Sequence, residues 1–253
     1  MVGRLCGCFG LGVMLAVSGV AKEYHVYILG GQSNMVGYGM TADLDPEEQK
    51  PVDGVMIFQG RNEKDNKVGR GGNGKWETLA PGQGNWAKCF GPELFFGRKM
   101  KELYPDRNIA IIKYARTGSS IAVEAAGHWG CWYPEYSKEN GINQWDHFLK
   151  TLENARVVKD IDGDGEPDTL VYSGIAWMQG ESDASKSEAI AKAYAANLKV
   201  LMDAMRAELK TAIPVAIAHI TNSNDAKAKG LPVKGGDVLE AHRHRARTAG
   251  QIC

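Results

Sequence analysis

The chain has no excess of either charge and no long apolar segment beyond its N-terminal stretch. Thirty basic residues balance thirty acidic ones in 253 residues, so the net charge gives no reason to expect nucleic acid or an anionic membrane as a partner. After that stretch, no run of residues is long and apolar enough to span a bilayer. The length suits one sizeable α/β domain, or at most two small ones.

Cysteine is scarce and forms no recognisable metal motif. Of five cysteines, Cys6 and Cys8 lie in the N-terminal stretch, and Cys89, Cys131 and Cys253 remain in the rest of the chain. Their spacing matches no zinc or redox pattern. In an exported protein Cys89 and Cys131 could form a disulfide; otherwise they are structural or free thiols.

The first 21 residues have the composition of a secretory signal peptide. Arg4 supplies a positive start, residues 11–20 are apolar apart from Gly and Ser, and Gly19 and Ala21 are small residues of the kind that precede a cleavage site. We expect residues 1–21 to be a signal peptide, and the product to be secreted or periplasmic without stable membrane insertion. A ragged N-terminus or an uncleaved anchor is the alternative.

Short apolar runs alternate with segments of helical periodicity along the rest of the chain. The apolar runs span residues 24–29, 108–114, 170–178 and 213–220. The predicted helices span residues 92–104, 143–159 and 187–210. Near-continuous apolar runs are typical of strands buried on both faces of a parallel sheet. The alternation predicts a three-layer α/β/α sandwich with a flavodoxin-like sheet, whose ligand lies beyond the carboxyl ends of the strands.

A serine in a glycine-rich turn directly follows the first apolar run. The segment reads Gly30-Gly31-Gln32-Ser33-Asn34-Met35. A nucleophilic serine needs an exposed hydroxyl on a tight turn, with backbone N–H groups free to face a developing oxyanion. A strand that ends in two glycines and opens a helix provides both features, although many such turns merely cap a helix with serine.

Two further polar motifs stand at the ends of the second and third apolar runs. Ala115-Arg116-Thr117-Gly118-Ser119-Ser120 follows the second run, and Trp177-Met178-Gln179-Gly180-Glu181-Ser182-Asp183 follows the third. By itself, Gly118 reads as an ordinary strand-to-loop glycine, and Glu181 as a cap on the following loop. Because all three motifs fall at strand ends, the fold would gather them at one edge of the sheet.

Together, the Gly-Gln-Ser-Asn-Met and Gln-Gly-Glu strings resemble the sialate O-acetylesterase-like carbohydrate esterases, a branch of the SGNH (GDSL-type) hydrolases. The resemblance implies that residues 22–253 form an SGNH-type domain that removes acetyl groups from an acetylated carbohydrate without a metal or organic cofactor. It implies that Ser33 is the nucleophile, that Gly118 and Gln179 donate hydrogen bonds to the oxyanion, and that Glu181 holds the site together by hydrogen bonding.

No Asp-x-x-His sequence occurs anywhere in the chain. The resembled family has such a block near its C-terminus, where it supplies the general base that a serine hydroxyl needs. We expect that the domain is truncated and lacks its last strand; alternatively, His242 or His244 serves as the base. Without a base, the chain would be a catalytically impaired or purely carbohydrate-binding relative, or a damaged gene product.

Two other segments have alternative interpretations. Residues 160–168 begin like a calcium-binding loop, but Val171 stands where such a loop has its bidentate glutamate, which favours a polar turn. Residues 127–141 are dense in aromatic side chains, namely Trp129, Trp132, Tyr133 and Tyr136. These aromatic residues form either a hydrophobic cluster beneath the loop or a wall on which a sugar stacks.

Overall fold

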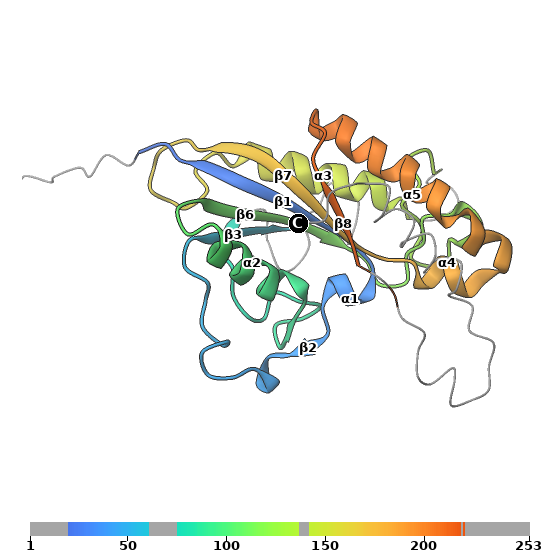
Figure 1. The fold of residues 1–253 in the computed structure, drawn as a ribbon, viewed down its shortest axis with the longest axis horizontal. Helices are drawn as coiled ribbons and strands as arrows, with labels where there is room; N and C mark the ends of the chain where they lie inside the picture. Colours follow the sequence, from blue (N-terminus) through green and yellow to red (C-terminus); the bar gives the residue numbers. More distant parts are fainter. Residues whose placement is uncertain (1–19, 61–74, 137–141, 219, 221–253) are drawn as a thin grey trace, which may run out of the picture.

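The computed structural model describes residues 20–60, 75–136, 142–218 and 220, and a six-stranded sheet lies at its centre (Figure 1). The strands are β1 (Glu23–Gly31), β3 (Val55–Gln59), β4 (Trp76–Thr78), β6 (Asn108–Ala115), β7 (Thr169–Met178) and β8 (Val215–Ile217). Their order is β4-β3-β6-β1-β7-β8, and every neighbouring pair is parallel except β3 and β4.

The predicted fold class is confirmed. The four predicted apolar runs form β1, β6, β7 and β8, in the spatial order β6-β1-β7-β8, which is the flavodoxin-like order with the first strand in the middle. A further strand, β3, extends the sheet beyond β6. β8 is shorter than its apolar run, because only three of its residues pair with β7. The expected loss of a last strand concerns residues 221–253, which lie outside the described part.

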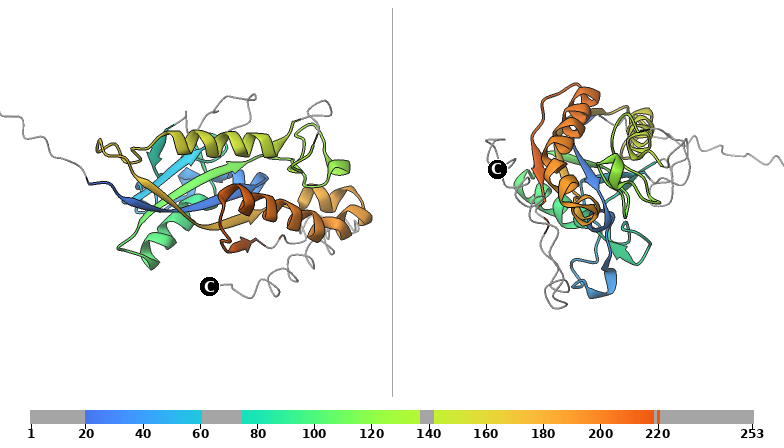
Figure 2. Two further views of the ribbon diagram at one scale, coloured as in Figure 1. Left: turned by 90° about the horizontal axis from the view of Figure 1, so that it is seen from above. Right: turned by 90° about the vertical axis from the view of Figure 1, so that its right-hand side faces the viewer.

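Helices cover both faces of this sheet (Figures 1 and 2). The helices and 3-10 turns are α1 (Ser33–Val36), η1 (Thr41–Asp43), α2 (Pro92–Leu103), η2 (Val123–Ala125), α3 (Gln144–Val157), α4 (Glu181–Lys186) and α5 (Glu188–Leu209). Alternate residues of β1 point to opposite faces: Val26 and Ile28 pack in one core with α3 and α5, whereas Tyr27 and Leu29 pack in another with α2. A two-stranded ribbon of β2 (Gly39–Met40) and β5 (Cys89–Phe90) lies apart from the main sheet.

The three long helices begin where the sequence predicts. Pro92 is the first residue of α2, where its missing N–H costs no intrahelical hydrogen bond. The side chain of Asn143 accepts hydrogen bonds from two N–H groups in the first turn of α3, and Ser187 accepts one from Ile190 in α5. These caps fix the ends of α3 and α5 and so the positions of the loops that lead into them.

The loop between α3 and β7 is held by a lysine ammonium. Nζ of Lys22 lies 2.5 Å from a carboxylate oxygen of Asp162 and 2.5 Å from one of Asp164, and the backbone N–H of Lys22 donates to Asp168. The hydrogen bond from Lys22 keeps the pKa of the Asp164 carboxyl below its usual range. We call this arrangement the Lys22 clasp. It agrees with the polar-turn interpretation of residues 160–168.

Other predictions concern the cysteines and the chain ends. Cys89 and Cys131 are both buried free thiols, so the possible disulfide between them is not formed. Within the described residues, no helix combines the length and the apolar character needed to cross a membrane. The predicted signal peptide up to residue 19, Cys253, and the tail histidines His242 and His244 lie outside the described residues.

A buried ion pair connects β6 to the helices on the α2 face. Lys113 of β6 and Glu93 of α2 are 4% and 0% exposed in their side chains, and Nζ of Lys113 lies 2.5 Å from Oε2 of Glu93. Lys113 also donates to the carbonyl oxygen of Val36, the last residue of α1, at 3.0 Å. The other oxygen of Glu93 accepts the N–H of Gly91 at 2.7 Å. This pair therefore fixes the end of α1, the helix that begins with Ser33, and the start of α2 against the sheet.

We predict that replacement of Lys113 by Met lowers the free energy of unfolding by about 3–5 kcal/mol, because a buried carboxylate then has no counter-ion. The double variant Lys113→Met with Glu93→Gln should lose less than Lys113→Met alone, since no buried charge remains. Urea unfolding of the parent, both single variants and the double variant measures this coupling. Strictly additive losses would show that the two charges do not interact.

Candidate active site

The three polar motifs meet at the carboxyl ends of β1, β6 and β7. Gly31, the last residue of β1, lies opposite Ala115 of β6 and Met178 of β7. A Cβ atom on Gly31 would come within 2.0 Å of the carbonyl oxygen of Met178, and the φ of Gly31 is +146°, so this position requires glycine. Ser33, Gly118, Gln179 and Glu181 all follow these strand ends. The structure thus brings the four predicted site residues to one edge of the sheet.

Ser33 is the first residue of α1 and is half-buried. The first N–H groups of a helix have no acceptor within the helix, so the N–H of Ser33 can serve a ligand. The backbone of this segment is fixed, because Gln32 donates to the carbonyl of Met178 at 2.9 Å and Arg116 donates to that of Gly31 at 3.0 Å. Among the described residues, no side chain forms a hydrogen bond with the Ser33 hydroxyl.

Gly118 lies in the tight turn after β6, at a position that accepts only glycine. Its φ is +74°, and a Cβ atom there would come within 2.5 Å of Cδ1 of Trp129. The turn is closed by Ser119, whose N–H and hydroxyl both donate to the carbonyl of Arg116, at 3.3 and 2.7 Å. Gly118 therefore presents backbone, without a side chain, at the edge of the sheet where Ser33 lies.

The side chain of Gln179 is fully buried and has several protein partners. Its Nε2 lies 3.0 Å from Oε1 of Gln32, 3.2 Å from the carbonyl of Ser119 and 2.7 Å from Oδ2 of Asp183. Its Oε1 accepts from the hydroxyl of Tyr194 at 3.0 Å. Because an amide has only two hydrogens, Gln179 can donate to an oxyanion only by releasing a present acceptor. Its role as an oxyanion donor stays a prediction.

Asp183 is a central residue of the site that the sequence analysis did not single out. Its fully buried carboxylate accepts the N–H of Ile121 at 3.0 Å and that of Ala122 at 2.8 Å, besides the amide of Gln179. Burial raises the pKa of this carboxyl, and the N–H donors, that of Ala122 first, lower it again in part. Asp183 was visible in the sequence only as the last residue of the third motif.

Gln32, which follows β1, is the third side chain that forms hydrogen bonds at this site. Its Oε1 accepts the amide of Gln179 and also the backbone N–H groups of Gly180 and Ser182, both at 3.4 Å. The side chains of Gln32, Gln179 and Asp183 thus link the segments that follow β1, β6 and β7. We call these three side chains the Gln32–Gln179–Asp183 network.

Glu181 is the first residue of α4 and lies beside the serine segment. Its Oε1 is 3.4 Å from Nδ2 of Asn34, the residue after Ser33. Its Oε2 is buried and has no hydrogen-bond partner among the described residues. Burial raises the pKa of this carboxyl, and the charge of Asp183 adds to the effect, whereas the amide of Asn34 opposes it. The predicted role of Glu181, to hold the site together by hydrogen bonding, stays a prediction, and its contact with Asn34 is the one that would serve it.

The described histidines differ in their surroundings. His147 is 6% exposed and stacks on the ring of Tyr114. His128, in contrast, is exposed, and its ring lies 4.3 Å from that of Trp129, the residue that packs on Gly118. His128 is therefore next to the turn that carries a predicted oxyanion donor. His219, expected from the sequence to be a buried imidazole, lies outside the described residues.

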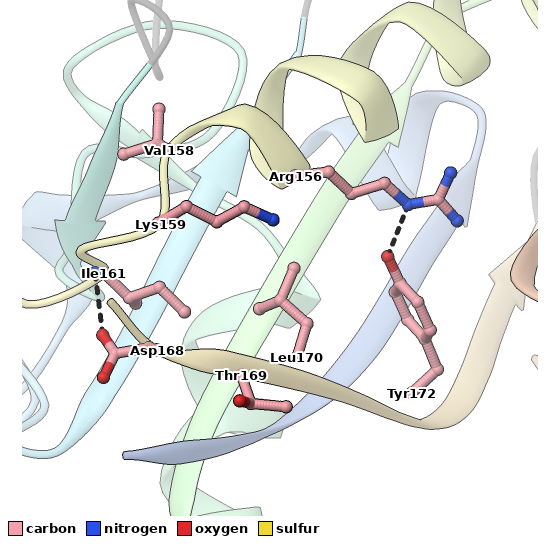
Figure 3. A pocket seen from close by; sticks show the side chains of 8 residues that line it. All are labelled: Arg156, Val158, Lys159, Ile161, Asp168, Thr169, Leu170 and Tyr172. Atoms are coloured by element: carbon pink, nitrogen blue, oxygen red, sulfur yellow. Dashed lines mark hydrogen bonds between the residues drawn. The ribbon is translucent and has the colours of Figure 1, made fainter. Parts of the chain in front are cut away.

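A cavity of about 320 Å³ lies at the other end of β7. Figure 3 shows the residues that line it: Arg156, Val158, Lys159, Ile161, Asp168, Thr169, Leu170 and Tyr172. Arg156 donates to the hydroxyl of Tyr172 at 2.8 Å across this cavity. The β7 residues that line the cavity are Thr169, Leu170 and Tyr172, in the first half of the strand, whereas the candidate active site follows Met178 at its end.

The fold and the site define an SGNH-like α/β/α scaffold with a serine on the first helical residue after the central strand. The model of the family described as carbohydrate esterase, sialic acid-specific acetylesterase, matches residues 23–237. The chain belongs to this family, which confirms the resemblance drawn from its motifs. Family membership makes it an esterase-like hydrolase related to sialate acetylesterases.

Solved structures show the same fold. A protein from Arabidopsis thaliana is 19% identical, with a TM-score of 0.54 over 92% of this chain and 83% of its own. A carbohydrate acetylesterase from Xanthomonas citri is 15% identical, with a TM-score of 0.58 over 88% of this chain and 47% of its own, so this chain spans about half of that protein. NanS is 18% identical, with a TM-score of 0.55 over 90% of this chain and 75% of its own. No curated protein sequence matches the chain.

We predict that Asp183→Asn lowers the free energy of unfolding by about 2–3 kcal/mol, because an amide cannot accept from all the buried N–H groups that face the carboxylate. Urea unfolding at neutral pH measures the change. Asp203→Asn is the matched control: Asp203 is exposed on α5, and its loss should change stability by less than about 0.5 kcal/mol. Equal effects at the two positions would contradict the central place of Asp183.

The raised pKa of Glu181 predicts a pH dependence. A carboxyl whose pKa is higher in the folded state stabilises the fold fully below its unfolded pKa, about 4.3, and this stabilisation is lost as pH rises through the folded-state pKa. The free energy of unfolding of the parent, relative to Glu181→Gln, should therefore fall from pH 4 towards neutral pH.

Glu188→Gln is the control of opposite sign, because the hydrogen bond from Lys192 lowers the pKa of Glu188. Relative to that variant, the parent should gain stability as pH rises through the same range. Denaturant curves at several pH values measure both differences. A parent that gains stability over Glu181→Gln with rising pH would show that Glu181 is held as an anion.

Proposed function

We propose that this protein removes O-acetyl groups from a carbohydrate, with Ser33 as its nucleophile. The observation that carries the proposal is the convergence of Ser33, the Gly118 turn and the Gln-Gly-Glu motif, which the Gln32–Gln179–Asp183 network ties together. Membership of the carbohydrate esterase family supports the reaction class and the kind of substrate. The proposal includes export, which rests on the composition of residues 1–21.

In the first step, the hydroxyl oxygen of Ser33 attacks the acetyl carbonyl carbon, and its proton passes to a base. The N–H groups of Ser33 and Gly118 stabilise the negative charge that develops on the carbonyl oxygen. The tetrahedral intermediate then collapses, the sugar hydroxyl leaves with a proton, and the acetyl group remains on Ser33. Water attacks this acyl-enzyme and releases acetate, which restores the serine hydroxyl.

Gln179 and Glu181 position these groups. Gln179 holds the carbonyl of Ser119, the residue after Gly118, and so fixes the turn that carries one donor. It would join the oxyanion hole as a third donor if a substrate displaced one of its present acceptors. Glu181 restrains Asn34 next to the nucleophile. In this proposal each contact acts on the geometry of Ser33 or of Gly118.

The base is a histidine in this proposal. The candidates are His242 and His244, which the sequence places near the C-terminus, and His128, which adjoins the Gly118 turn through Trp129. An imidazole has the pKa suited to accept the serine proton near neutral pH.

The test is hydrolysis of 4-nitrophenyl acetate by the purified protein. We predict that the parent releases nitrophenolate faster than buffer and that Ser33→Ala reduces the rate to background, since no acyl-enzyme can then form. Ser185→Ala, which removes an exposed hydroxyl from α4, should keep the parental rate. Loss of activity in one of His128→Ala, His242→Ala and His244→Ala would identify the base. A rate that persists in Ser33→Ala would exclude Ser33 as the nucleophile.

A carbohydrate-binding protein without catalysis is the second candidate. It is favoured by one observation: no side chain of the described residues forms a hydrogen bond with the Ser33 hydroxyl. A parent that matches buffer in the esterase assay but binds an O-acetylated sugar would support this second function over the first.

A further inference from the structure

The tryptophans of this chain fall into two groups by burial. Four of the six are buried, with exposed fractions between 0% and 9%: Trp76, Trp132, Trp145 and Trp177. Trp86 and Trp129 are 53% and 37% exposed. An indole is highly buried on average, so the two exposed ones call for an explanation. Both lie at the candidate active site, as their contacts show.

Trp129 stands on the turn that carries Gly118. Its Cδ1 would touch a side chain at Gly118, and the guanidinium carbon of Arg116 lies 4.0 Å from the centre of its ring. Its carbonyl oxygen accepts the side-chain amide of Gln144 at 2.6 Å, and Gln144 is fully buried. The backbone of Trp129 is thus held by a buried side chain, and its ring by the half-buried Arg116. Of the aromatic loop expected from the sequence, Trp132 and Tyr136 belong to the core, whereas Trp129 is exposed.

Trp86 is linked to the serine helix through Tyr38. The ring of Tyr38 meets that of Trp86 edge-on, with centroids 5.8 Å apart. Tyr38 follows Gly37, whose N–H donates to the carbonyl of Ser33 at 3.1 Å and whose carbonyl accepts the N–H of Asn85 at 2.9 Å. The hydroxyl of Tyr38 is 2.7 Å from that of Thr117, the residue before Gly118. Tyr38 therefore connects the Trp86 side of the site to the Gly118 turn.

We propose that Trp86 and Trp129 form a sugar-binding subsite that holds the ring of the acetylated carbohydrate at Ser33. The proposal rests on the proposed function and names how the substrate is recognised. The C–H groups on one face of a sugar ring carry partial positive charge, which suits the negative face of an indole. The Tyr38 ring contacts Trp86, and its hydroxyl is 2.7 Å from that of Thr117; these two hydroxyls suit the sugar hydroxyls, in the usual combination of aromatic walls with a few polar groups.

The contacts also assign different parts to the two tryptophans. Trp129 is in direct contact with the turn of the oxyanion donor, so it holds the part of the sugar nearest the ester. Trp86 reaches the site through Tyr38, and is more exposed, so it contacts the sugar ring farther from the ester. A small aryl acetate carries its acetyl group on a flat ring and has no sugar hydroxyls. Its hydrolysis should therefore depend less on Trp86 and Trp129 than the hydrolysis of an acetylated sugar does.

The experiment compares two substrates. The values of kcat/KM for an O-acetylated sialic acid and for 4-nitrophenyl acetate are measured for the parent, Trp86→Ala, Trp86→Phe and Trp129→Ala. We expect the ratio of sugar to aryl kcat/KM to fall about tenfold in each alanine variant, and Trp86→Phe to retain most of it. Tyr104→Ala is the control, because Tyr104 is an exposed aromatic at the end of α2, and it should leave the ratio unchanged.

Binding is measured separately from catalysis, so that the two proposals can fail independently. Tryptophan fluorescence of Ser33→Ala is titrated with the same O-acetylated sialic acid, alone and combined with Trp86→Ala or Trp129→Ala. Weaker binding in the combined variants supports the subsite even if the parent has no esterase activity. A sugar to aryl ratio that stays constant in every variant, or sugar binding that survives both alanine substitutions, would overturn the proposal.

Discussion

The candidate active site depends on one buried contact, between the carboxylate of Asp183 and the side-chain amide of Gln179. Around this contact, three loops that follow three separate strands exchange hydrogen bonds in a region closed to water. A polar group in such a place is costly unless every partner is present. The arrangement therefore forms as a whole, and the position of Ser33 relative to Gly118 follows from it.

The residues that position Ser33 are distinct from the groups that would carry out the reaction. The positioning contacts come from the centre of the sheet. There β1 lies between β6 and β7, and the Lys113–Glu93 pair anchors the serine segment to the sheet. The chemistry requires a proton acceptor, and the described residues provide none within hydrogen-bond reach of the Ser33 hydroxyl. The nucleophile turn is therefore held independently of a base, because none of the contacts that fix it among the described residues involves a histidine.

The sequence predicted most of the framework and about half of the site. Apolar runs indicated the strands and helical periodicity indicated the three long helices, since both signals are local. Asp183 and Gln32 were not identified as structural residues, because their partners lie far away along the chain and only folding brings them together. The same holds for Trp86 and Tyr38, in a long segment without periodicity. The neighbours Trp129 and Trp132 could not be told apart, because their burial depends on the path of the loop.

The Lys22 clasp lies at the end of the sheet opposite the candidate active site, and it concerns how that end of the fold is held together. Loops with this spacing of aspartates commonly need a divalent cation to offset their mutual repulsion. Here the offsetting charge is part of the polypeptide, on the residue that leads into β1. Because it is covalently attached, this charge cannot diffuse away as a bound ion can. The clasp therefore joins the loop before β7 to the start of the central strand through a charge that the chain itself carries.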